Sequence, residues 1–377
     1  YKTLEIIWIK ADKITIADLT IRRAVHHPIH AQATGSETIE GILLHNLKIV
    51  DGGQQLIKVN SDGKGHFVDR GRVACSTLEI TADGRKHVDP GAGGCYTGGI
   101  DVHGGRGWVV RNNTVRGIYC KNGVLSEHAV HFWSASRDTL FERNLIVDCA
   151  RGIGFGLRES GKDRAYPDDP YPNAGYIGHY DGIIRNNVIH AGPQAAPYFD
   201  TGIELAQARG VRVYHNTVVS EPTYSSIDTR FANTRAEIRN NLTHRITSRA
   251  NAQATVDHNL EQTPASLFVD AAGVDYHLEP TATQAIDQRK SVAEAGLDNI
   301  RFVLGDTTSP ELDGLQADCA VINMVLHHTP NPGEVLRDVS SRLAADGVVL
   351  VTDLCNHDQG WARENCGDLW LGFDPQE

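Results

Sequence analysis

The segment Ile100-Asp101-Val102-His103 carries the sharpest local pattern for chemistry in this sequence. An aspartate and a histidine two positions apart on a β-strand point to the same face, because successive side chains alternate between the two faces. A carboxylate beside an imidazole suits acid/base chemistry, in which the histidine accepts and returns a proton near neutral pH. The alternative is a pair that is held only by hydrogen bonds to neighbouring segments.

Segments of the same kind recur along the chain, each with apolar first and third residues. If the strands stack in register, about 4.8 Å apart, the second and fourth residues form two columns that face solvent. Gly154 and Gly156 have no side chains, so they would leave a bare floor of backbone between the polar side chains of the two columns. We expect the insertion at 158–180 to form a wall over this floor. The first column reads His30, Lys58, Asp101, His131, Gly154, Glu204, Asp228, and the second reads Gln32, Asn60, His103, Trp133, Gly156, Ala206, Arg230.

Five of these side chains suit proton transfer. Asp101 with His103 or His131 would move the proton. Lys58 and Arg230 would counter negative charge on a substrate and so acidify a neighbouring carbon. For each cation the alternative is an ordinary solvated surface charge.

The remaining polar members of the columns would contact the substrate. Trp133 offers a flat face on which a sugar ring can stack, and His30, Asn60 and Asp228 offer polar edges. Glu204 lies one coil from Asp228, so the two carboxylates form a second acid/base candidate, with Ca²⁺ as an alternative occupant.

A second repeat links the strands: a polar residue, usually Asn, directly precedes an apolar one. Its spacing varies from 18 residues (Asn241 to Asn259) to 43 residues (Asn144 to Asn187). Irregular recurrence of this kind predicts a solenoid whose coils bury their apolar strands by stacking. We expect the polar residues to lie at a left-handed turn and to stack their amides. They are Asp18, Asn46, Thr77, Asn113, Asn144, Asn187, Asn216, Asn241 and Asn259.

These repeats resemble the right-handed parallel β-helix proteins of the pectate-lyase-like superfamily, over about residues 4 to 287. The resemblance implies an all-β, right-handed parallel β-helix over residues 1–288. Asp101 and His103 also resemble the Asp-Pro-His-Asp motif of alginate-type C5-epimerases and related lyases, with Val102 in place of the Pro and Gly104 in place of the second Asp. The resemblance to this motif implies a lyase or C5-epimerase that acts on acidic polysaccharide. The alternative is a non-catalytic carbohydrate-binding or surface solenoid.

The amino-acid composition indicates a domain boundary near residue 290 and argues against nucleic acid and membranes as partners. The net charge is −11, and residues 290–377 hold 15 acidic but only 5 basic residues, which indicates two parts of different origin. No basic patch favours nucleic acid and no apolar run of about 18 residues favours a membrane, so we expect neither partner, and a monomer. The chain opens in strand-like sequence near Leu4 without an apolar leader, which we interpret as a truncated start of an extracellular or periplasmic β-helix.

Four of the seven cysteines lie in the expected solenoid. Cys75 with Cys95, and Cys120 with Cys149, are each about one coil apart and would suit disulfides in an exported protein; the alternative is four unpaired thiols. None of their spacings is typical of a zinc site, so we predict no metal site and no required cofactor.

From about residue 289 the pattern changes to alternating strands and helices, with strands at 299–306, 317–323 and 347–353 and a helix at 332–343. This part resembles the middle of a class I S-adenosylmethionine-dependent methyltransferase, on Gly305-Asp306, the segment Asn323–His328 with Pro330, and the segments 357–361 and 367–373. The resemblance implies that Asp306 meets the adenine, that Asn323 lines the cofactor pocket, and that the tail is cytoplasmic in origin.

The Gly-rich loop and the acidic residue that hold the cofactor in such enzymes lack counterparts here. We therefore expect an incomplete Rossmann-like methyltransferase segment over 289–377, a remnant that binds no S-adenosylmethionine and has no activity.

Overall fold

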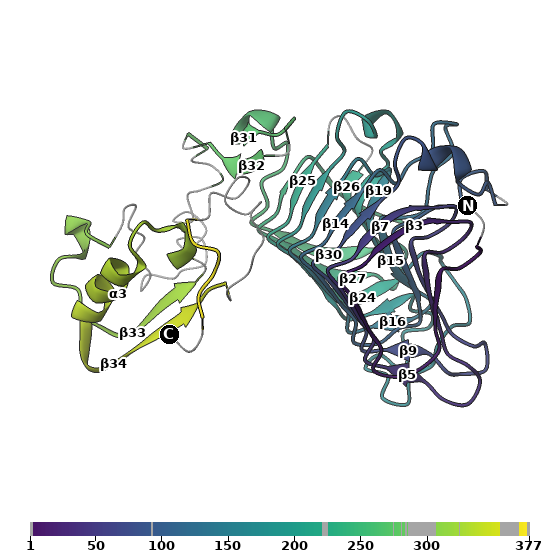
Figure 1. Cartoon of the computed structure of the whole chain (residues 1–377), viewed down its shortest axis with the longest axis horizontal. Helices are drawn as coiled ribbons and strands as arrows, with labels where there is room; N and C mark the ends of the chain where they lie inside the picture. The colour runs from purple at the N-terminus through teal and green to yellow at the C-terminus, as the bar shows by residue number, and fades with distance from the viewer. Residues whose placement is uncertain are drawn as a thin grey trace. The chain divides into compact units, whose positions relative to one another are not determined.

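The computed structural model describes residues 3–91, 93–220, 225–273, 275–279, 281–282, 285, 307–323, 325–354 and 369–374. The chain divides into two compact units, Tyr1–Asp287 and Gln288–Glu377 (Figure 1).

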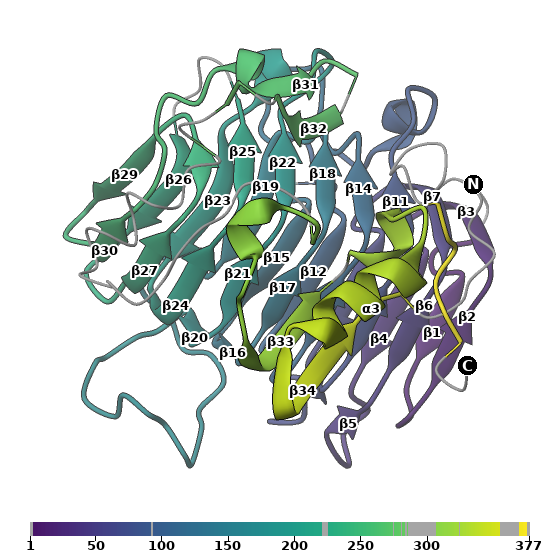
Figure 2. The ribbon, with the colours of Figure 1, turned by 90° about the vertical axis from the view of Figure 1, so that its left-hand side faces the viewer.

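The first unit is built from three long sheets in which strands of successive coils pair in parallel, as Figure 2 shows for β14, β18, β22 and β25. This arrangement confirms the expected all-β parallel β-helix. Sheet A holds β1 (Ile7–Ile9), β4 (Ile29–Gln32), β8 (Ile57–Asn60), β12 (Ile100–His103), β15 (Val130–Trp133), β19 (Arg151–Phe155), β23 (Thr201–Ala206), β26 (Ser225–Arg230) and β29 (Ile246–Arg249).

Two further sheets complete the wall of each coil. Sheet B holds β2 (Thr15–Ala17), β6 (Leu43–His45), β10 (Arg72–Ala74), β13 (Val109–Arg111), β16 (Ser136–Arg137), β17 (Leu140–Glu142), β20 (His179–Tyr180), β21 (Ile183–Arg185), β24 (Ala208–Tyr214), β27 (Arg235–Arg239) and β30 (Gln253–Asp257). Sheet C holds β3 (Thr20–Ala24), β7 (Lys48–Gly52), β11 (Thr77–Glu79), β14 (Thr114–Arg116), β18 (Leu145–Val147), β22 (Val188–His190), β25 (Thr217–Val219) and β28 (Leu242–Thr243).

Several short strands and 3-10 helices lie outside the three long sheets. The strands β5 (Ile39–Glu40) and β9 (Val68–Asp69) pair in parallel, whereas β31 (Phe268–Asp270) and β32 (Asp275–Leu278) form an antiparallel pair after the last coil. Short 3-10 helices are η1 (Gly84–His87), η2 (Ala196–Tyr198) and η3 (Ala265–Leu267).

The strand register predicted for sheet A is confirmed. Asp101 pairs with Lys58 on one side and with His131 on the other, and three coils beyond Asp101, Glu204 pairs with Asp228 of the next coil. The alternate residues point inward, where Ile100 and Val102 are fully buried in one continuous apolar core. The polar column therefore lies on the outer face of sheet A, because successive side chains of a strand point to opposite faces of the sheet.

The expected amide stack is also present. From Asn113 to Asn259 each side-chain Nδ2 donates to the Oδ1 of the asparagine on the next coil, at 2.8–3.0 Å. The left-handed residue is the one before each ladder asparagine, as at Asn112 (φ 55°). Asn46 (φ 49°) thus corresponds to Asn112, so its assignment to the ladder was wrong. Ser76 holds the ladder position one coil before Asn113, whose Oδ1 accepts from the Ser76 backbone N–H.

Removing one ladder amide should destabilise the coils on both sides. In Asn187→Ala, the buried Asn144 backbone N–H loses its acceptor and the Phe141 carbonyl loses its donor. We expect a loss of about 2–4 kcal/mol in the free energy of unfolding, because each buried unpaired polar group costs about 1–3 kcal/mol. Denaturant titration checks this, with the exposed Asn173→Ala as control, for which we expect a change within about 0.5 kcal/mol. Equal midpoints for the two variants would show that the ladder adds no stability.

Both cysteine expectations were wrong, because the disulfide joins Cys95 to Cys120, whose Cα atoms are 6.1 Å apart. These cysteines lie in the loops that lead into β12 and β15, and so at the same place on two neighbouring coils. Cys75 and Cys149 are unpaired, the first exposed and the second buried. Spacing of about one coil is therefore not sufficient, since both cysteines must also occupy the same corner of the coil.

The two free thiols of the first unit should differ sharply in reactivity. Burial raises the pKa of the Cys149 thiol to about 12, so almost no thiolate forms there at neutral pH, and the thiolate is the reactive species. We expect an alkylating reagent to modify Cys75 in the folded protein and Cys149 only after unfolding. Peptide mass spectrometry of labelled samples measures this; rapid native labelling of Cys149 would contradict its burial.

The second unit contains β33 (Ala317–Asn323), α3 (Pro332–Ser341) and β34 (Leu343–Thr352), together with the 3-10 helices η4 (Pro310–Leu312) and η5 (Leu326–His328). The strands β33 and β34 pair in parallel, as expected for a fragment of an α/β sheet, and Asn331 caps α3. The expected strand at 299–306 lies outside the described residues. Among the described residues, no helix has the length and apolar character needed to cross a bilayer.

Candidate functional site

The first polar column is buried, contrary to the expectation that it faces solvent. His30, Lys58 and Asp101 are each at most 8% exposed, and His131, Glu204 and Asp228 at most 2%. Side chains of neighbouring coils bond to one another across the column, and residues that precede the strands fold over it. The second column is the accessible one, because Asn60, His103, Trp133 and Arg230 all remain partly exposed.

The centre of the column is an ion pair between Lys58 and Asp101, which share a short contact between Nζ and Oδ2. His103 Nε2 lies 2.9 Å from Lys58 Nζ and 3.1 Å from Asp101 Oδ2. A neutral ring with its proton on Nδ1 can accept from the ammonium, whereas a ring protonated at Nε2 can donate to the carboxylate. The two partners therefore accommodate both tautomers of the neutral ring. When Nε2 donates to Asp101, the lone pair is on Nδ1, and this nitrogen can then act as the base.

Burial and pairing act in opposite directions on this ion pair. Burial alone would lower the pKa of Lys58, but the Asp101 carboxylate outweighs it, and the pKa of Lys58 is raised. Burial alone would raise the pKa of Asp101, but Lys58 and His103 hold that pKa well below its ordinary value. Both groups are charged at neutral pH, and the charge of Lys58 is already compensated within the protein.

Trp133 lies directly beside this network. Its Nε1 donates to Asp101 Oδ1 at 2.8 Å, and its ring packs edge-on to His103 with centroids 4.4 Å apart. The guanidinium of Arg158 lies over the Trp133 ring, 5.5 Å from its centroid, and this side chain is 44% exposed. An aromatic face, a cation and an imidazole thus meet at the surface.

His131 is held apart from solvent behind the Trp133 ring, which stacks on it with a centroid distance of 5.5 Å. Its Nε2 donates to the Gly156 carbonyl at 3.0 Å, which leaves the lone pair on Nδ1. Burial, with the nearby His128, lowers the pKa of His131 to about 3, so its ring is neutral at neutral pH. His131 is 1% exposed and is therefore not presented to a ligand at the surface as His103 is.

The floor expected at Gly154 is not bare. The His128 ring fills it, since a Cβ at Gly154 would come within 2.8 Å of three atoms of that ring. His128 Nε2 lies 3.4 Å from Glu204 Oε2, and Arg230 forms a short contact with Glu204 Oε1. Burial would raise the pKa of Glu204, but the contact with His128 and the charge of Arg230 lower it to about 2.

The outer members of the column make separate clusters. Asp228 is bound by Arg249, at 2.7 Å, and by Thr247, so it shares no ligand with Glu204 although the two are neighbours. At the other end His30 stacks on Trp8, and its Nε2 accepts from Asn60 Nδ2 at 3.2 Å. Burial lowers the pKa of His30 to about 4. The predicted residues are thus brought into one file, but only Lys58, Asp101, His103, His131 and Trp133 form one contiguous network.

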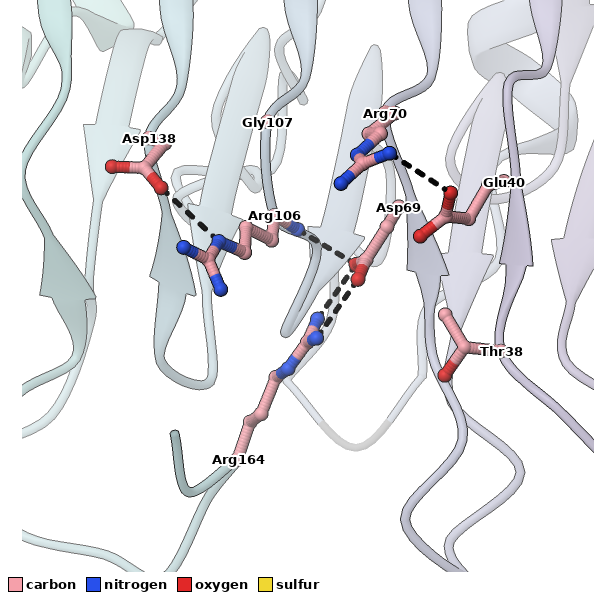
Figure 3. Close-up of a pocket in the computed structure, with 8 residues that line it drawn as sticks. All are labelled: Thr38, Glu40, Asp69, Arg70, Arg106, Gly107, Asp138 and Arg164. Carbon is pink, nitrogen blue, oxygen red and sulfur yellow. Dashed lines mark hydrogen bonds and ion pairs between the residues drawn. The ribbon is translucent and has the colours of Figure 1, made fainter. Parts of the chain in front are cut away.

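The insertion at 158–180 contacts the second column through Arg158, whose guanidinium lies over the Trp133 ring, while the His128 ring covers Gly154. Arg164 binds both carboxylate oxygens of Asp69 and donates to the Gly104 carbonyl, next to His103. Beside this contact lies a hollow of about 560 Å³, shown in Figure 3. Its charged side chains bond largely to one another. It is lined by Thr38, Glu40, Asp69, Arg70, Arg106, Gly107, Asp138 and Arg164.

Three residues of this region were not found from the sequence: Glu127, His128 and Arg158. His128 stands three positions before His131, and on a regular strand such a pair points to opposite faces. The chain enters β15 only at Val130, so His128 belongs to the preceding loop and folds back over the outer face. The sequence signal that could have identified His128 was its position just before a strand that carries a second histidine, His131.

The described residues of the second unit do not form a pocket for S-adenosylmethionine. Asn323, at the end of β33, accepts from Thr352 Oγ1 at 2.5 Å, and Asp353 accepts from His327 Nδ1 and the Leu326 backbone N–H. The polar groups at the carboxyl ends of both strands are thus bonded to one another. The described part of this unit shows no Gly-rich turn after a strand, and Asp306 lies outside the described residues.

Comparisons with known proteins give two findings and one absence. The methyltransferase domain family matches residues 120–377 by its sequence model. Among solved structures, PfbA, a surface protein and adhesin of Streptococcus pneumoniae, is similar with a TM-score of 0.43 and 12% identity, over 66% of this chain and 64% of that one. No curated protein matches the chain.

The matched range begins inside the β-helix, since residues 120–287 contribute coils and only the remainder forms the second unit. A methyltransferase fold needs a parallel sheet covered by helices, which the coils do not supply. The structural counterpart of the match is therefore the β33–α3–β34 segment. By sequence the chain belongs to the methyltransferase domain family, and it joins this domain to a parallel β-helix.

Proposed function

We propose that the β-helix unit acts on an acidic polysaccharide, as a uronan lyase or C5-epimerase, through the surface around His103. The observation that carries the proposal is the His103 imidazole, 26% exposed, against the buried Lys58–Asp101 pair. In this role His103 takes the C5 proton, Asp101 orients the ring and holds its charge, and Lys58 keeps Asp101 ionised. Expected roles for His131 and for Lys58 as a sugar contact are not part of the proposal, because both are buried.

Substrate charge and stacking are assigned to the neighbouring surface. Both arginines are paired, Arg158 with Asp163 and Arg230 with Glu204, but Arg158 is the more exposed of the two (44% against 22%). In the proposal Arg158 meets the uronate carboxylate and so helps to stabilise the negative charge that develops when the C5 proton leaves. Trp133 offers its ring to the sugar beside it.

The one-sided placement of His103 favours elimination over epimerisation. In a lyase a single base on one face removes the C5 proton, a double bond forms between C4 and C5, and the glycosidic oxygen at C4 leaves with its electron pair and takes a proton from the protonated base or from water. An epimerase must return a proton to the opposite face, which calls for a second donor across the sugar. His131, the second histidine in the file, lies behind Trp133 on the same side.

The compartment is part of the same proposal. A disulfide between Cys95 and Cys120 persists in oxidising surroundings, and polymeric uronans are met outside the cytoplasm. These two points support an extracellular or periplasmic location for the β-helix unit.

The test is a substrate panel of alginate, pectate and other uronans with the full chain. Elimination creates a double bond conjugated to the carboxylate, and its ultraviolet absorbance should rise with at least one substrate. The rise should be absent with neutral polysaccharides of similar length. If no uronan yields unsaturated product or an altered C5 configuration, the catalytic proposal fails.

A second candidate is carbohydrate binding without turnover, favoured by the hollow in Figure 3. Arg106 there is shared between Asp138 and Asp168, and Arg70 pairs with Glu40 at 3.3 Å, so an acidic chain could exchange partners with both cations. Retention of a uronan by the inactive protein, weakened by Arg106→Ala and unchanged by His103→Gln, would support this function.

A further inference from the structure

We infer that Glu127, His128 and His131 form a binding site for a divalent transition-metal ion, with Zn²⁺ as the fitting example. One ligand atom from each of the three residues lies within 4.8 Å of those of the other two. The site is separate from the proposed reaction at His103, and it stands whether or not the β-helix acts on a uronan.

The first argument is that two acceptor atoms, His131 Nδ1 and Glu127 Oε2, face each other without a donor between them, beside Asp101 Oδ1, which accepts from Trp133 Nε1. His131 donates through Nε2 to Gly156, so its Nδ1 carries a lone pair. That Nδ1 lies 3.9 Å from Glu127 Oε2 and 3.8 Å from Asp101 Oδ1. A lone pair that faces two carboxylates is unfavourable unless a cation lies between them.

The second argument is the His128 ring, which is 1% exposed: its Nε2 lies 3.4 Å from Glu204 Oε2, and its buried Nδ1 has no hydrogen-bond partner. A buried polar atom without a hydrogen-bond partner destabilises the fold. The ring packs against His131 with centroids 4.5 Å apart, so a nitrogen of each imidazole can reach the same ion. Glu127, with a side chain 34% exposed, would connect the ion to solvent.

The three ligand atoms lie within 4.8 Å of one another, so they must move closer together to bind one ion. Zn–N and Zn–O bonds of about 2.0–2.2 Å place tetrahedral ligand atoms about 3.3 Å apart, against 3.9 Å between His131 Nδ1 and Glu127 Oε2. Two imidazoles and one carboxylate leave a fourth position for water, as in zinc sites of the catalytic kind. The Gly156 carbonyl holds the outer nitrogen of His131, the support that metal-binding histidines usually have.

The ligand set also selects the metal. Ca²⁺ and Mg²⁺ prefer oxygen ligands, whereas two imidazoles suit Zn²⁺, Co²⁺, Ni²⁺ or Cu²⁺. The other acidic candidate, Glu204 with Asp228, is less suited to a cation because each carboxylate is bound by its own arginine.

The test is metal binding by the full chain after treatment with a chelator. We expect one equivalent of Zn²⁺ to bind in competition with a chromophoric chelator, and Ca²⁺ not to displace it. X-ray absorption at the zinc edge should show nitrogen and oxygen neighbours. A shell of sulfur neighbours would place the ion at cysteines and overturn the inference.

Variants locate the site. Glu127→Gln and His128→Gln each remove a direct ligand of the ion. Each should weaken Zn²⁺ binding by more than about 100-fold, because loss of a group that only supports a ligand already costs roughly 10- to 100-fold. His66→Gln removes a partly exposed histidine paired with Asp62 and is the matched control, expected to bind as the wild type does. Glu127 lies at the surface, so its variant keeps the test valid if the buried His128 variant fails to fold. Absence of tight binding in the wild type, or equal binding by Glu127→Gln and the wild type, would overturn the inference.

Discussion

Lys58→Met should lower the free energy of unfolding of the β-helix by about 3–5 kcal/mol, the usual cost of removing one partner of a buried ion pair. The variant leaves the Asp101 carboxylate, 5% exposed, without the ammonium that compensates it. The double variant Lys58→Met/Asp101→Leu should recover most of the loss, because it removes the stranded charge as well. Denaturant titration of the three proteins measures the effect, and equal loss in the single and double variants would contradict the stated cause.

The same variant should show a characteristic dependence on pH. In the wild type the pKa of Asp101 is held well below 3.8, so its ionisation stabilises the fold above that value and the stabilisation is lost as the pH falls through the folded pKa. Without Lys58, burial raises the pKa of Asp101, although His103 and His131 still face it. The gap in stability between wild type and Lys58→Met should therefore shrink below about pH 4. Titration in the presence of a chelator keeps metal binding out of the comparison.

His103→Gln should reduce turnover of a uronan by about 10²- to 10⁴-fold, the usual contribution of a general base. Glutamine keeps a hydrogen-bonding group beside Asp101 but has no titratable nitrogen, so folding and substrate binding should change little. Initial rates and KM measured with the best substrate of the panel separate the two effects. An unchanged rate in His103→Gln would remove this residue from the mechanism, and His66→Gln serves as a control that should retain the wild-type rate.

The fold was predictable because each coil repeats the same physical constraint. Alternating residues such as Ile100 and Val102 must face the core, so Asp101 and His103 had to lie on the outer face, and the stacking register followed from the repeat. The asparagine ladder followed likewise from Asn113 onward. Its earlier members were misplaced, because Asn46 occupies the left-handed position instead of the ladder position.

The site was less predictable, because strand periodicity says nothing about what lies above an outer face. The sequence placed the first column in solvent, whereas His128 folds from the loop before β15 and covers Gly154. Neither the pairing of Arg230 with Glu204 nor that of Arg249 with Asp228 follows from alternation, since long side chains choose partners across coils. The disulfide prediction was wrong for a similar reason: sequence spacing shows which coil each cysteine belongs to, but not where on the circumference of that coil it lies.

The most direct test is proton exchange at C5 of a uronan oligomer in heavy water, read by NMR with the full chain. We expect the wild type to place deuterium at C5 or to release the unsaturated product, and His103→Gln to do neither. If the variant exchanges C5 as fast as the wild type, or the wild type leaves every uronan of the panel unchanged, the polar network around His103 stabilises the β-helix and does not catalyse.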